Sequence, residues 1–395
     1  MIAPLHRRHF LATGGAVAAT GVQLSAPVLA STGSSRPQWH ILGIAPASEK
    51  LPQLAHDYRR GVELGLAQAG ASQVGLTWLS AGPLPAAPAQ AIGSALQGGR
   101  IDAVMGWMPP LLAKKVSALT EKAGVPLWIS DSGADIAAPS EHTPLQVRHS
   151  LELCAMASAL ADKVYAQCGP RAFLSMGWHE SGYDFIQAFQ HRWRTLGGQI
   201  VGRHIAGAPG RLHEFGELRE AIISQQPDVV VALFSGSQTQ RFTQWWQVQQ
   251  PLLRTELAGF PWLLEQNAGM RAWSVSSWPT PEHAEPRWKL QFERAGLAWT
   301  APALLGAEAG SSVGSALVAA LPGSNAKDVW SELRATPLSG PRGERQWSSA
   351  SSDSTGSLWE RAAPNASTWL QRHAAPLLSP SARANGGWTT GYFLT

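Results

Sequence analysis

Short apolar runs alternate with segments of helical periodicity along most of the chain, and this alternation leaves few folds open to it. The first part predicts strands at 39–44, 74–79, 101–106 and 125–129, with helices between them at 53–69, 87–97 and 110–123. Strands that alternate with helices of this length form parallel sheets with helices on both faces. We therefore expect an α/β lobe in this part of the chain.

The same pattern starts again after residue 150, which predicts a second α/β lobe. Its strands are expected at 172–176, 199–202, 228–234, 256–260 and 271–275, and its helices at 151–166, 182–196, 214–224 and 239–248. Three further helices are expected at 283–295, 306–321 and 326–335. A length of 395 residues, 44% of them hydrophobic, suits two compact lobes with ordinary cores.

The points where the pattern stops and restarts set the expected domain boundaries. We expect lobe 1 to comprise 37–147 and 276–345, and lobe 2 to comprise 148–275 and 346–362. The hinge is expected near Arg148-His149 and near Ser276-Ser277. Residues 363–395 are rich in Ser, Pro, Gly and Ala, which predicts a loosely packed C-terminal tail.

Residues 1–30 have the features of a targeting segment. The run Arg7-Arg8-His9-Phe10-Leu11 resembles a twin-arginine signal, which is an address for folded cargo, and a Gly/Ala-rich apolar stretch and small residues follow it. An ordinary secretory signal with two arginines is the alternative. Both predict export, and we expect a periplasmic protein. The apolar stretch is shorter than the about 20 residues of a membrane span.

The net charge argues against a nucleic-acid partner, and the spacing of the two cysteines argues against a disulfide. The formal net charge is +4, and it falls to +2 without Arg7 and Arg8, which argues against a nucleic-acid partner. Cys154 and Cys168 lie 14 residues apart. On one continuous helix they would be about 21 Å apart, whereas a disulfide needs Cα atoms within about 7 Å. Two free thiols are therefore expected, unless the helix ends early.

Two stretches in the second lobe and a turn near the C-terminus resemble the periplasmic branched-chain amino-acid-binding family, the type I solute-binding proteins. The stretches are GYDFIQAFQHRWRTLGGQIVG and FGELREAIISQQPDVVVALFSGSQTQRF, and the Gly-Pro-x-Gly turn lies at 340–343. The order and spacing of these motifs match over about Trp39 to Trp359. The matching positions are Gly182, Phe185, Phe189, Gly197, Gly198, Phe215, Leu218, Ile222, Pro227, Asp228 and Gly236.

The resemblance implies a soluble receptor that is not an enzyme and carries no cofactor. It implies a periplasmic binding protein of type I: two Rossmann-like lobes with parallel central sheets, joined by three crossovers and a hinge. A small-molecule ligand would lie in the cleft between the lobes. The receptor, expected to be a monomer, would then dock on an ABC permease in the inner membrane.

The sequence departs from this family in two loops that are expected to face the cleft. Trp107 and Met108 stand where a small residue or Ser is usual, and Ala134 stands where a Thr is expected. Asp131 and Ser132 remain as polar candidates for ligand contact. The departures argue against an ordinary amino-acid ligand, and we expect an apolar or aromatic-bearing one.

Tryptophan is abundant, with 18 residues, and several fall on loops at the expected cleft. Trp107 of lobe 1 and Trp178 and Trp262 of lobe 2 could stack on a flat ligand and keep an N–H for a polar atom. The alternative is that they pack in the core or the hinge. We favour that alternative for the residues inside expected elements, Trp128, Trp193 and Trp273.

Two further loops of lobe 2 carry polar candidates. His179, Glu180 and Tyr183 lie just before an expected helix, where they could contact a ligand amine or form a solvated turn that complements the helix dipole. Ser235 and Gln238 could contact the ligand, or belong only to a turn that caps the next helix.

Enzyme motifs are missing from the sequence. It contains no Gly-x-Ser-x-Gly elbow, no Walker loop and no His-Glu-x-x-His, and its twelve His lack the paired spacing of a metal site. We therefore expect no catalytic residues and no metal. The leading interpretation is a solute receptor of an importer. A ligand sensor on the same fold and an unrecognised periplasmic enzyme remain as alternatives.

Overall fold

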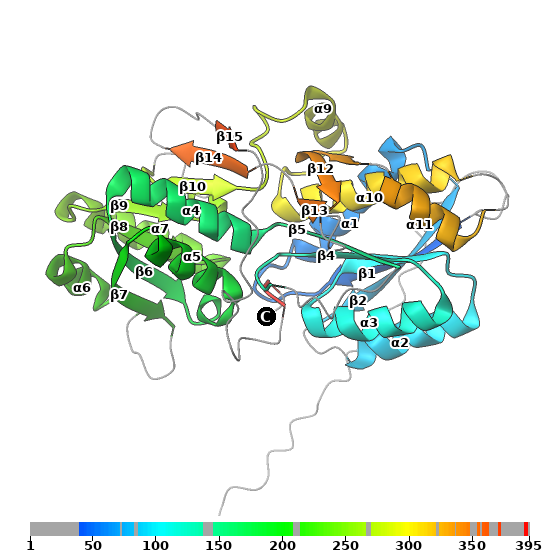
Figure 1. The fold of residues 1–395 in the computed structure, drawn as a ribbon, viewed down its shortest axis with the longest axis horizontal. Helices are drawn as coiled ribbons and strands as arrows, with labels where there is room; N and C mark the ends of the chain where they lie inside the picture. The colour runs from blue at the N-terminus through cyan, green and yellow to red at the C-terminus, as the bar shows by residue number, and fades with distance from the viewer. Residues whose placement is uncertain are drawn as a thin grey trace, which may run out of the picture.

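Two sheets, each covered by helices on both faces, form the two lobes of the chain (Figure 1). The computed structural model describes residues 39–71, 73–82, 86–136, 145–207, 214–265, 270–320, 324–335, 337–347, 354–355, 358–362, 370–372 and 391–393. The targeting segment at 1–30 lies outside these ranges. None of the helices within them is long and apolar enough to cross a membrane.

Lobe 1 is built on five parallel strands. Its first elements are β1 (Trp39–Pro46), α1 (Leu54–Gln68), β2 (Val74–Ala81), α2 (Ala86–Gly98), β3 (Ala103–Trp107), α3 (Pro110–Ala123), β4 (Leu127–Asp131) and β5 (Gln146–Ser150). The strand order is β2-β1-β3-β4-β5, so the order reverses at β1. In such sheets a crevice opens at the carboxyl ends of the two strands on either side of the reversal, here β1 and β3.

Lobe 2 repeats this arrangement. Its elements are α4 (Leu153–Cys168), β6 (Arg171–Gly177), α5 (Asp184–Thr195), β7 (Gln199–Ala206), α6 (Leu218–Gln225), β8 (Val229–Leu233), α7 (Ser237–Gln249), β9 (Glu256–Gly259) and β10 (Trp273–Ser276). The strands β7-β6-β8-β9-β10 are parallel, with the reversal at β6. The antiparallel strands β14 (Leu358–Ala362) and β15 (Leu370–Arg372) extend the sheet beyond β10.

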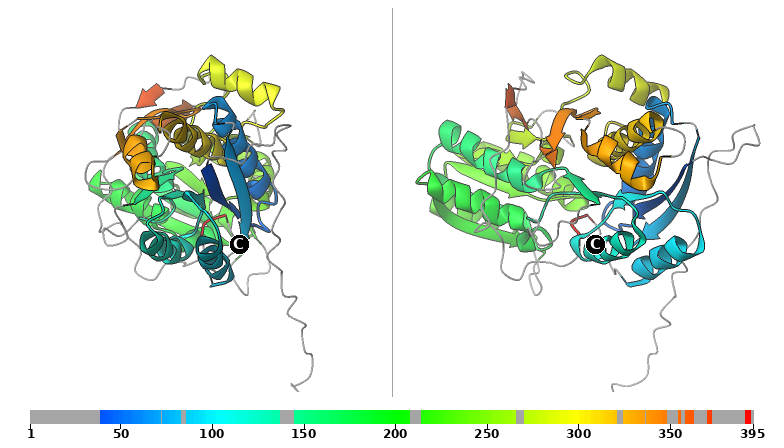
Figure 2. Two further views of the ribbon diagram at one scale, coloured as in Figure 1. Left: turned by 90° about the vertical axis from the view of Figure 1, so that its right-hand side faces the viewer. Right: turned by 45° about the vertical axis from the view of Figure 1, so that its right-hand side comes forward.

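The remaining elements lie around these two sheets. They are the short 3-10 turns η2 (Glu180–Gly182) and η3 (Gln250–Leu252), and then α8 (Pro261–Glu265), α9 (Pro286–Arg294), α10 (Ala301–Ala319), α11 (Ala326–Ala335), β11 (Leu338–Gly340), β12 (Gly343–Trp347) and β13 (Ser354–Thr355). Helices α10 and α11 lie on lobe 1 although they follow lobe 2 in the sequence (Figures 1 and 2).

Alternation of side chains along the strands explains why each sheet has helices on both faces. In β3, Val104 packs in the core under α2 and α3, whereas Met105 packs in the core that also holds α1 and α10. In β6, Phe173 packs with α6 and α7, and Leu174 with α4 and α5. Successive strand residues point to opposite faces, so strands buried on both sides are apolar throughout.

The predicted α/β fold class is confirmed, and the predicted helices and strands are present within a few residues. Two differences have physical causes. Strand β3 extends to Trp107, which was expected in a loop. Strand β5 was missed because Gln146, Arg148 and His149 are polar, yet all three are buried. Both cysteines lie in α4 and are free, as predicted from their spacing.

Helices α1 and α10 touch backbone to backbone through glycines. A Cβ added at Gly61 would lie 2.1 Å from the Ala303 carbonyl oxygen, and one at Gly310 would lie 2.1 Å from the Val62 carbonyl oxygen. Gly65 and Gly306 make the same kind of approach, so each helix contributes a pair of glycines four residues apart. This contact fixes α10 on lobe 1.

Replacing Gly61 with alanine should therefore lower the free energy of unfolding by about 1–3 kcal/mol, the usual cost of overpacking. The added methyl would meet a backbone oxygen that cannot rotate away. Gly93→Ala in α2 is the matched control, because its nearest neighbour is a Leu119 side-chain atom at 3.7 Å. There the better helix propensity of alanine should raise stability by about 0.5–1 kcal/mol. Urea unfolding measures both, and a stabilised Gly61→Ala chain would contradict the contact.

Candidate functional site

The carboxyl ends of β1, β3 and β4 in lobe 1 face those of β6 and β8 in lobe 2. Loops from the two lobes contact each other directly there. The Phe185 amide donates to the Ala134 carbonyl at 3.1 Å, and the Ile136 amide donates to the Asp184 carboxylate at 2.9 Å. The cleft between the lobes is thus closed along one side.

Glu180 is the polar centre of this cleft. It lies in η2, just after β6, and its side chain is fully buried. Its carboxylate accepts hydrogen bonds from the Lys50 ammonium of lobe 1 at 2.7 Å and from the Ser235 hydroxyl at 2.5 Å. Burial lowers the pKa of Lys50, and the facing Glu180 carboxylate opposes that shift. A buried carboxylate needs such partners because desolvation of an unpaired charge is very costly.

An aromatic wall from lobe 2 continues from Glu180. The rings of His179, Tyr183 and Phe185 all contact the ring of Tyr392, and the His179 ring stacks on it with an interplanar angle of 10°. Burial, together with the charge of Lys50, lowers the pKa of His179 to about 4. His179 is therefore a neutral aromatic surface at physiological pH.

A second aromatic group spans the two lobes. The Phe393 ring lies 6.3 Å from that of Trp107 in lobe 1 and 5.7 Å from that of Trp262 in lobe 2. The Trp262 indole N–H also donates to the Phe234 carbonyl. Tyr392 and Phe393 are 1% and 5% exposed, so the expectation of a loosely packed tail is wrong for residues 391–393.

The lobe 1 side of the cleft carries the polar residues after β3 and β4. The Asp131 carboxylate pairs with Arg148 at 2.5 Å and accepts the Gly133 amide at 2.6 Å. These residues, with Trp107, Met108 and Ser132, line a small cavity to which Gly391 and Tyr392 also contribute. Its free volume of about 10 Å³ is the space of a single water molecule at most.

The structure brings most of the predicted residues together and leaves Trp178 apart, with 43% of its surface exposed. Gln238 lies at the edge of the cleft: its amide N–H donates to Glu214 at 2.7 Å, and its amide oxygen faces Gly177 beside the Glu180 carboxylate. The other predicted residues lie around the cleft: Trp107, Met108, Asp131, Ser132, His179, Glu180, Tyr183, Ser235 and Trp262.

Sequence reasoning missed Lys50, Arg148, Tyr392 and Phe393. Lys50 follows β1 at its carboxyl end, a position that could have indicated it. Arg148 was considered only as part of the hinge. Nothing in the sequence indicated that the aromatic pair near the C-terminus lies in the cleft, because even Trp262, which Phe393 contacts, is 131 residues away along the chain.

A buried ionic network lies behind the cleft, where the chain crosses between the lobes. Arg342, at the predicted Gly-Pro-x-Gly turn, pairs with Glu308 of α10 at 2.5 Å. It also donates to the Ser150 carbonyl at 2.8 Å and to the Ser277 hydroxyl at 3.3 Å. One guanidinium therefore ties together three separate chain segments at the crossing between the lobes.

His149 of β5 belongs to the same network and should make stability depend on pH. Burial lowers its pKa from 6.5 to about 4, helped by Arg342 and Arg345 and opposed by Glu308, and its Nε2 lies 2.6 Å from the Ser130 hydroxyl. As the pH falls below 6.5, the unfolded chain takes up a proton first. The folded state should thus lose about 3 kcal/mol between pH 7 and pH 4 through this residue.

The comparison of wild type with His149→Gln isolates this effect. Asp135 acts in the opposite direction, because burial and the nearby Asp184 and Asp131 raise its pKa from 3.8 to about 7. That contribution is common to both chains and cancels in the difference. Urea unfolding at pH 7 and pH 4 should show wild type losing about 3 kcal/mol more than the variant. An equal loss in both chains would contradict a neutral, buried His149.

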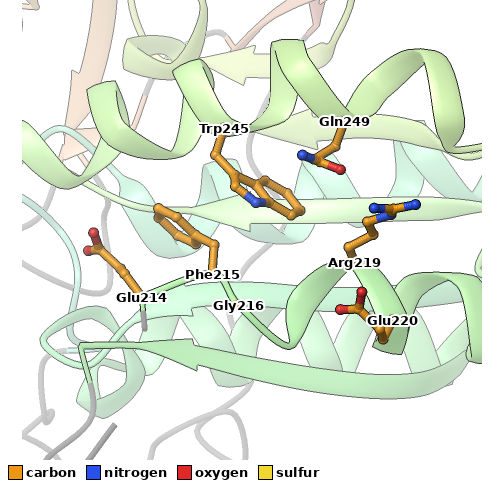
Figure 3. Close-up of a pocket in the computed structure, with 7 residues that line it drawn as sticks. All are labelled: Glu214, Phe215, Gly216, Arg219, Glu220, Trp245 and Gln249. Carbon is orange, nitrogen blue, oxygen red and sulfur yellow. The ribbon is translucent and has the colours of Figure 1, made fainter. Parts of the chain in front are cut away.

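A larger hollow of about 500 Å³ lies on the surface of lobe 2 (Figure 3). It is open to solvent between α6 and α7, and it is lined by Phe215, Trp245 and the charged Glu214, Arg219 and Glu220. Glu214 is already paired with Arg241 at 2.7 Å. This hollow lacks the enclosed walls of a solute site, so we assign no ligand to it.

Comparison with known proteins identifies the fold. No protein-family model and no curated protein matches the sequence. Among solved structures, an ABC transporter substrate-binding protein from Sphaerobacter thermophilus is 19% identical, with a TM-score of 0.71 over 85% of this chain and 96% of its own. An ABC transporter solute-binding protein from R. palustris in complex with 4-hydroxybenzoate is 15% identical, with a TM-score of 0.67 over 85% and 96%.

A leucine-binding protein from Thermotoga maritima is 16% identical, with a TM-score of 0.63 over 87% of this chain and 99% of its own. The likeness thus spans nearly the whole of these proteins at low identity. The chain has the fold of the solute-binding proteins of ABC transporters, the type I periplasmic binding fold predicted from its sequence motifs.

Proposed function

We propose that this protein is a non-catalytic receptor that holds a small, aromatic-bearing solute between its lobes and delivers it to an ABC permease in the inner membrane. The observation that carries the proposal is the aromatic cleft at the carboxyl ends of the strands, with Glu180, Lys50 and Ser235 as its polar centre. Ligands of doubly wound lobes bind at this end of the sheet.

The character of the cleft supports an aromatic solute. Its walls are the rings of Trp107, His179, Tyr183 and Trp262. In this structure these rings contact the aromatic side chains of Tyr392 and Phe393. Small-molecule sites usually have such apolar and aromatic walls, together with a few polar groups that orient the ligand. The R. palustris neighbour, whose structure holds 4-hydroxybenzoate, has the same fold and supports this class of ligand by analogy.

Closure of the lobes would be the receptor's signal to the permease. We place the hinge at the segments joined by Arg342, near Ser150 and Ser277, which keeps all of β5 in lobe 1 and all of β10 in lobe 2. The boundaries expected from the sequence, after 147 and after 275, thus move to about 150 and 277. Rotation about such a hinge makes and breaks the Lys50–Glu180 pair, which joins the lobes. The solute shifts the balance toward the closed form by contacting both lobes.

The setting we propose is the periplasm, reached through the twin-arginine signal at Arg7-Arg8. Replacing both arginines with lysines should leave unprocessed protein in the cytoplasm, because the export receptor reads the guanidinium pair and not charge alone. Fractionation of the producing cells, followed by blotting for precursor and mature chain, measures this. Normal periplasmic delivery of the Lys-Lys chain would contradict the twin-arginine assignment.

A thermal-shift screen tests the receptor function. We would titrate hydroxybenzoates, phenylpropanoids, aromatic amino acids and aliphatic amino acids to millimolar concentration. A ligand at 100 times its Kd stabilises the folded state by about 2.7 kcal/mol. Glu180→Ala should abolish the shift, and Glu121→Ala, which removes an exposed acid near the far end of α3, should retain it. Shifts that survive Glu180→Ala would place the site elsewhere.

A further inference from the structure

We infer that the C-terminal segment Gly391-Tyr392-Phe393 is a tethered occupant of the solute cleft, which a solute must displace in order to bind. The inference rests on the proposed function for the identity of the cleft. The segment lies between the two lobes in Figure 1 and in the right-hand view of Figure 2. Its two rings contact lobe 1 through Trp107 and lobe 2 through His179 and Trp262.

The first step in the argument is the space that the segment takes. With Gly391 and Tyr392 in place, the cavity beside Asp131 and Ser132 has a free volume of about 10 Å³. Sites for small solutes have volumes of about 300–1,000 Å³. The part of the cleft beside Asp131 and Ser132 therefore has no room for a solute while the segment is seated, so a solute that binds there must displace the segment.

The second step is the chemistry of Tyr392. Its ring packs against His179, and the Lys50 ammonium lies 6.0 Å from the ring centre, within reach of a cation–π contact. Burial and the nearby Glu180 raise the pKa of its hydroxyl, so the ring is a neutral phenol. The segment thus presents to Glu180 and Ser235 the group that a hydroxy-aromatic solute would present.

The third step is that the fit is incomplete. Among the described residues, the Tyr392 hydroxyl is buried without a hydrogen bond of ordinary geometry, although Glu180 and Ser235 are close by. A buried polar group left unsatisfied costs about 1–3 kcal/mol. A free solute is not held by a chain, and it can place its hydroxyl on Glu180 or Ser235 and gain what the segment loses. A hydroxy-aromatic solute would therefore make a hydrogen bond that the segment does not make, and this favours its displacement of the segment.

Because the segment belongs to the same chain as the cleft, it competes strongly with a solute, yet a solute can still displace it. A tethered group has an effective concentration of about 1 mM. If the free segment binds with a Kd of about 10 µM, the tether reduces the affinity of any competitor about 100-fold. The chain would then respond only to solutes that bind well or are abundant, and a weakly held solute would be excluded.

The test uses the full-length double variant Tyr392→Ser/Phe393→Ser and a synthetic acetylated peptide TTGYFLT, the sequence of residues 389–395. Calorimetric titration should show one peptide bound to each double-variant chain, and about 100-fold weaker binding to the intact chain. The control peptide TTGSSLT should bind neither. Equal peptide affinity of the two chains, or no binding to a folded double variant, would overturn the inference.

Hydrogen exchange on the unmodified chain gives a second measurement that does not depend on how the variant folds. The Tyr392 and Phe393 amides should exchange slowly and should exchange faster when excess peptide is added. Fast exchange from the start, or slow exchange that peptide does not accelerate, would overturn the inference. Peptide binding needs no solute, so a failed solute screen on a chain that binds peptide counts against the proposed receptor function alone. A solute that binds the intact chain and the double variant equally keeps that function and overturns the tethered occupant.

Discussion

Replacing Arg342 with methionine is expected to lower the free energy of unfolding by about 3–5 kcal/mol, the usual cost of removing one partner from a buried ion pair. The Arg342 side chain is fully buried, as is its partner Glu308. Burial disfavours the ionised form of Glu308. Arg342, Arg345 and His149 nevertheless lower its pKa to about 2, so the carboxylate stays ionised. Without the Arg342 guanidinium, the buried Glu308 carboxylate loses its hydrogen-bonded partner, and its charge remains in the interior.

Two controls separate this effect from simple loss of packing. The double variant Arg342→Met/Glu308→Met should recover most of the lost stability, because apolar residues of similar size often replace a buried pair at no cost. Arg100→Met removes a pair with Asp102 whose arginine is 70% exposed, and should change stability by less than about 1 kcal/mol. Chemical denaturation measures all three. A double variant as unstable as Arg342→Met would contradict the electrostatic account.

Trp107→Ala and Trp178→Ala should differ sharply in stability. Trp107 is 1% exposed and packs edge-on against Tyr58 at 5.8 Å, so its truncation should cost about 3–5 kcal/mol. Trp178 is 43% exposed, and its truncation should cost less than about 1 kcal/mol. From the sequence, both indoles were candidates to stack on a flat ligand. The burial of Trp107 now predicts a large structural effect in addition to any effect on binding.

Thermal or urea unfolding of the two variants decides between these expectations. Solute and peptide affinity, measured on the same samples at a temperature where both are folded, shows whether Trp107 also contacts the occupant of the cleft. Similar stability of the two variants would mean that Trp107 is not part of the core in solution.

The periodicity of the sequence was sufficient to predict the two lobes because local physics determines each strand and helix. Runs such as Val229–Leu233 are buried on both faces and are therefore apolar throughout. The resemblance to solute-binding proteins then predicted the cleft. Strand β5 escaped because its polar side chains are buried in pairs: Gln146 with Ser117, Arg148 with Asp131, and His149 with Ser130.

The contents of the cleft depend on contacts between distant residues, which no local pattern encodes. Glu180 was a candidate on its own loop, but its partner Lys50 is 130 residues away. Arg342 was seen only as part of a family turn, and its buried partner Glu308 lies in a helix that looked merely apolar. Tyr392 and Phe393 sit beyond a stretch whose composition suggested a loose tail, and their burial follows from tertiary packing alone.

The most direct test of a solute receptor is mass spectrometry of the small molecules released on denaturing the protein purified from the periplasm of its producing cells. The Tyr392→Ser/Phe393→Ser chain should be used beside the intact chain, with Glu180→Ala as the control. Our account predicts one hydroxy-aromatic compound in near-stoichiometric amount from the double variant, less from the intact chain and none from Glu180→Ala. Release of no small molecule from a folded double variant that also fails to bind the screened aromatic solutes would contradict it.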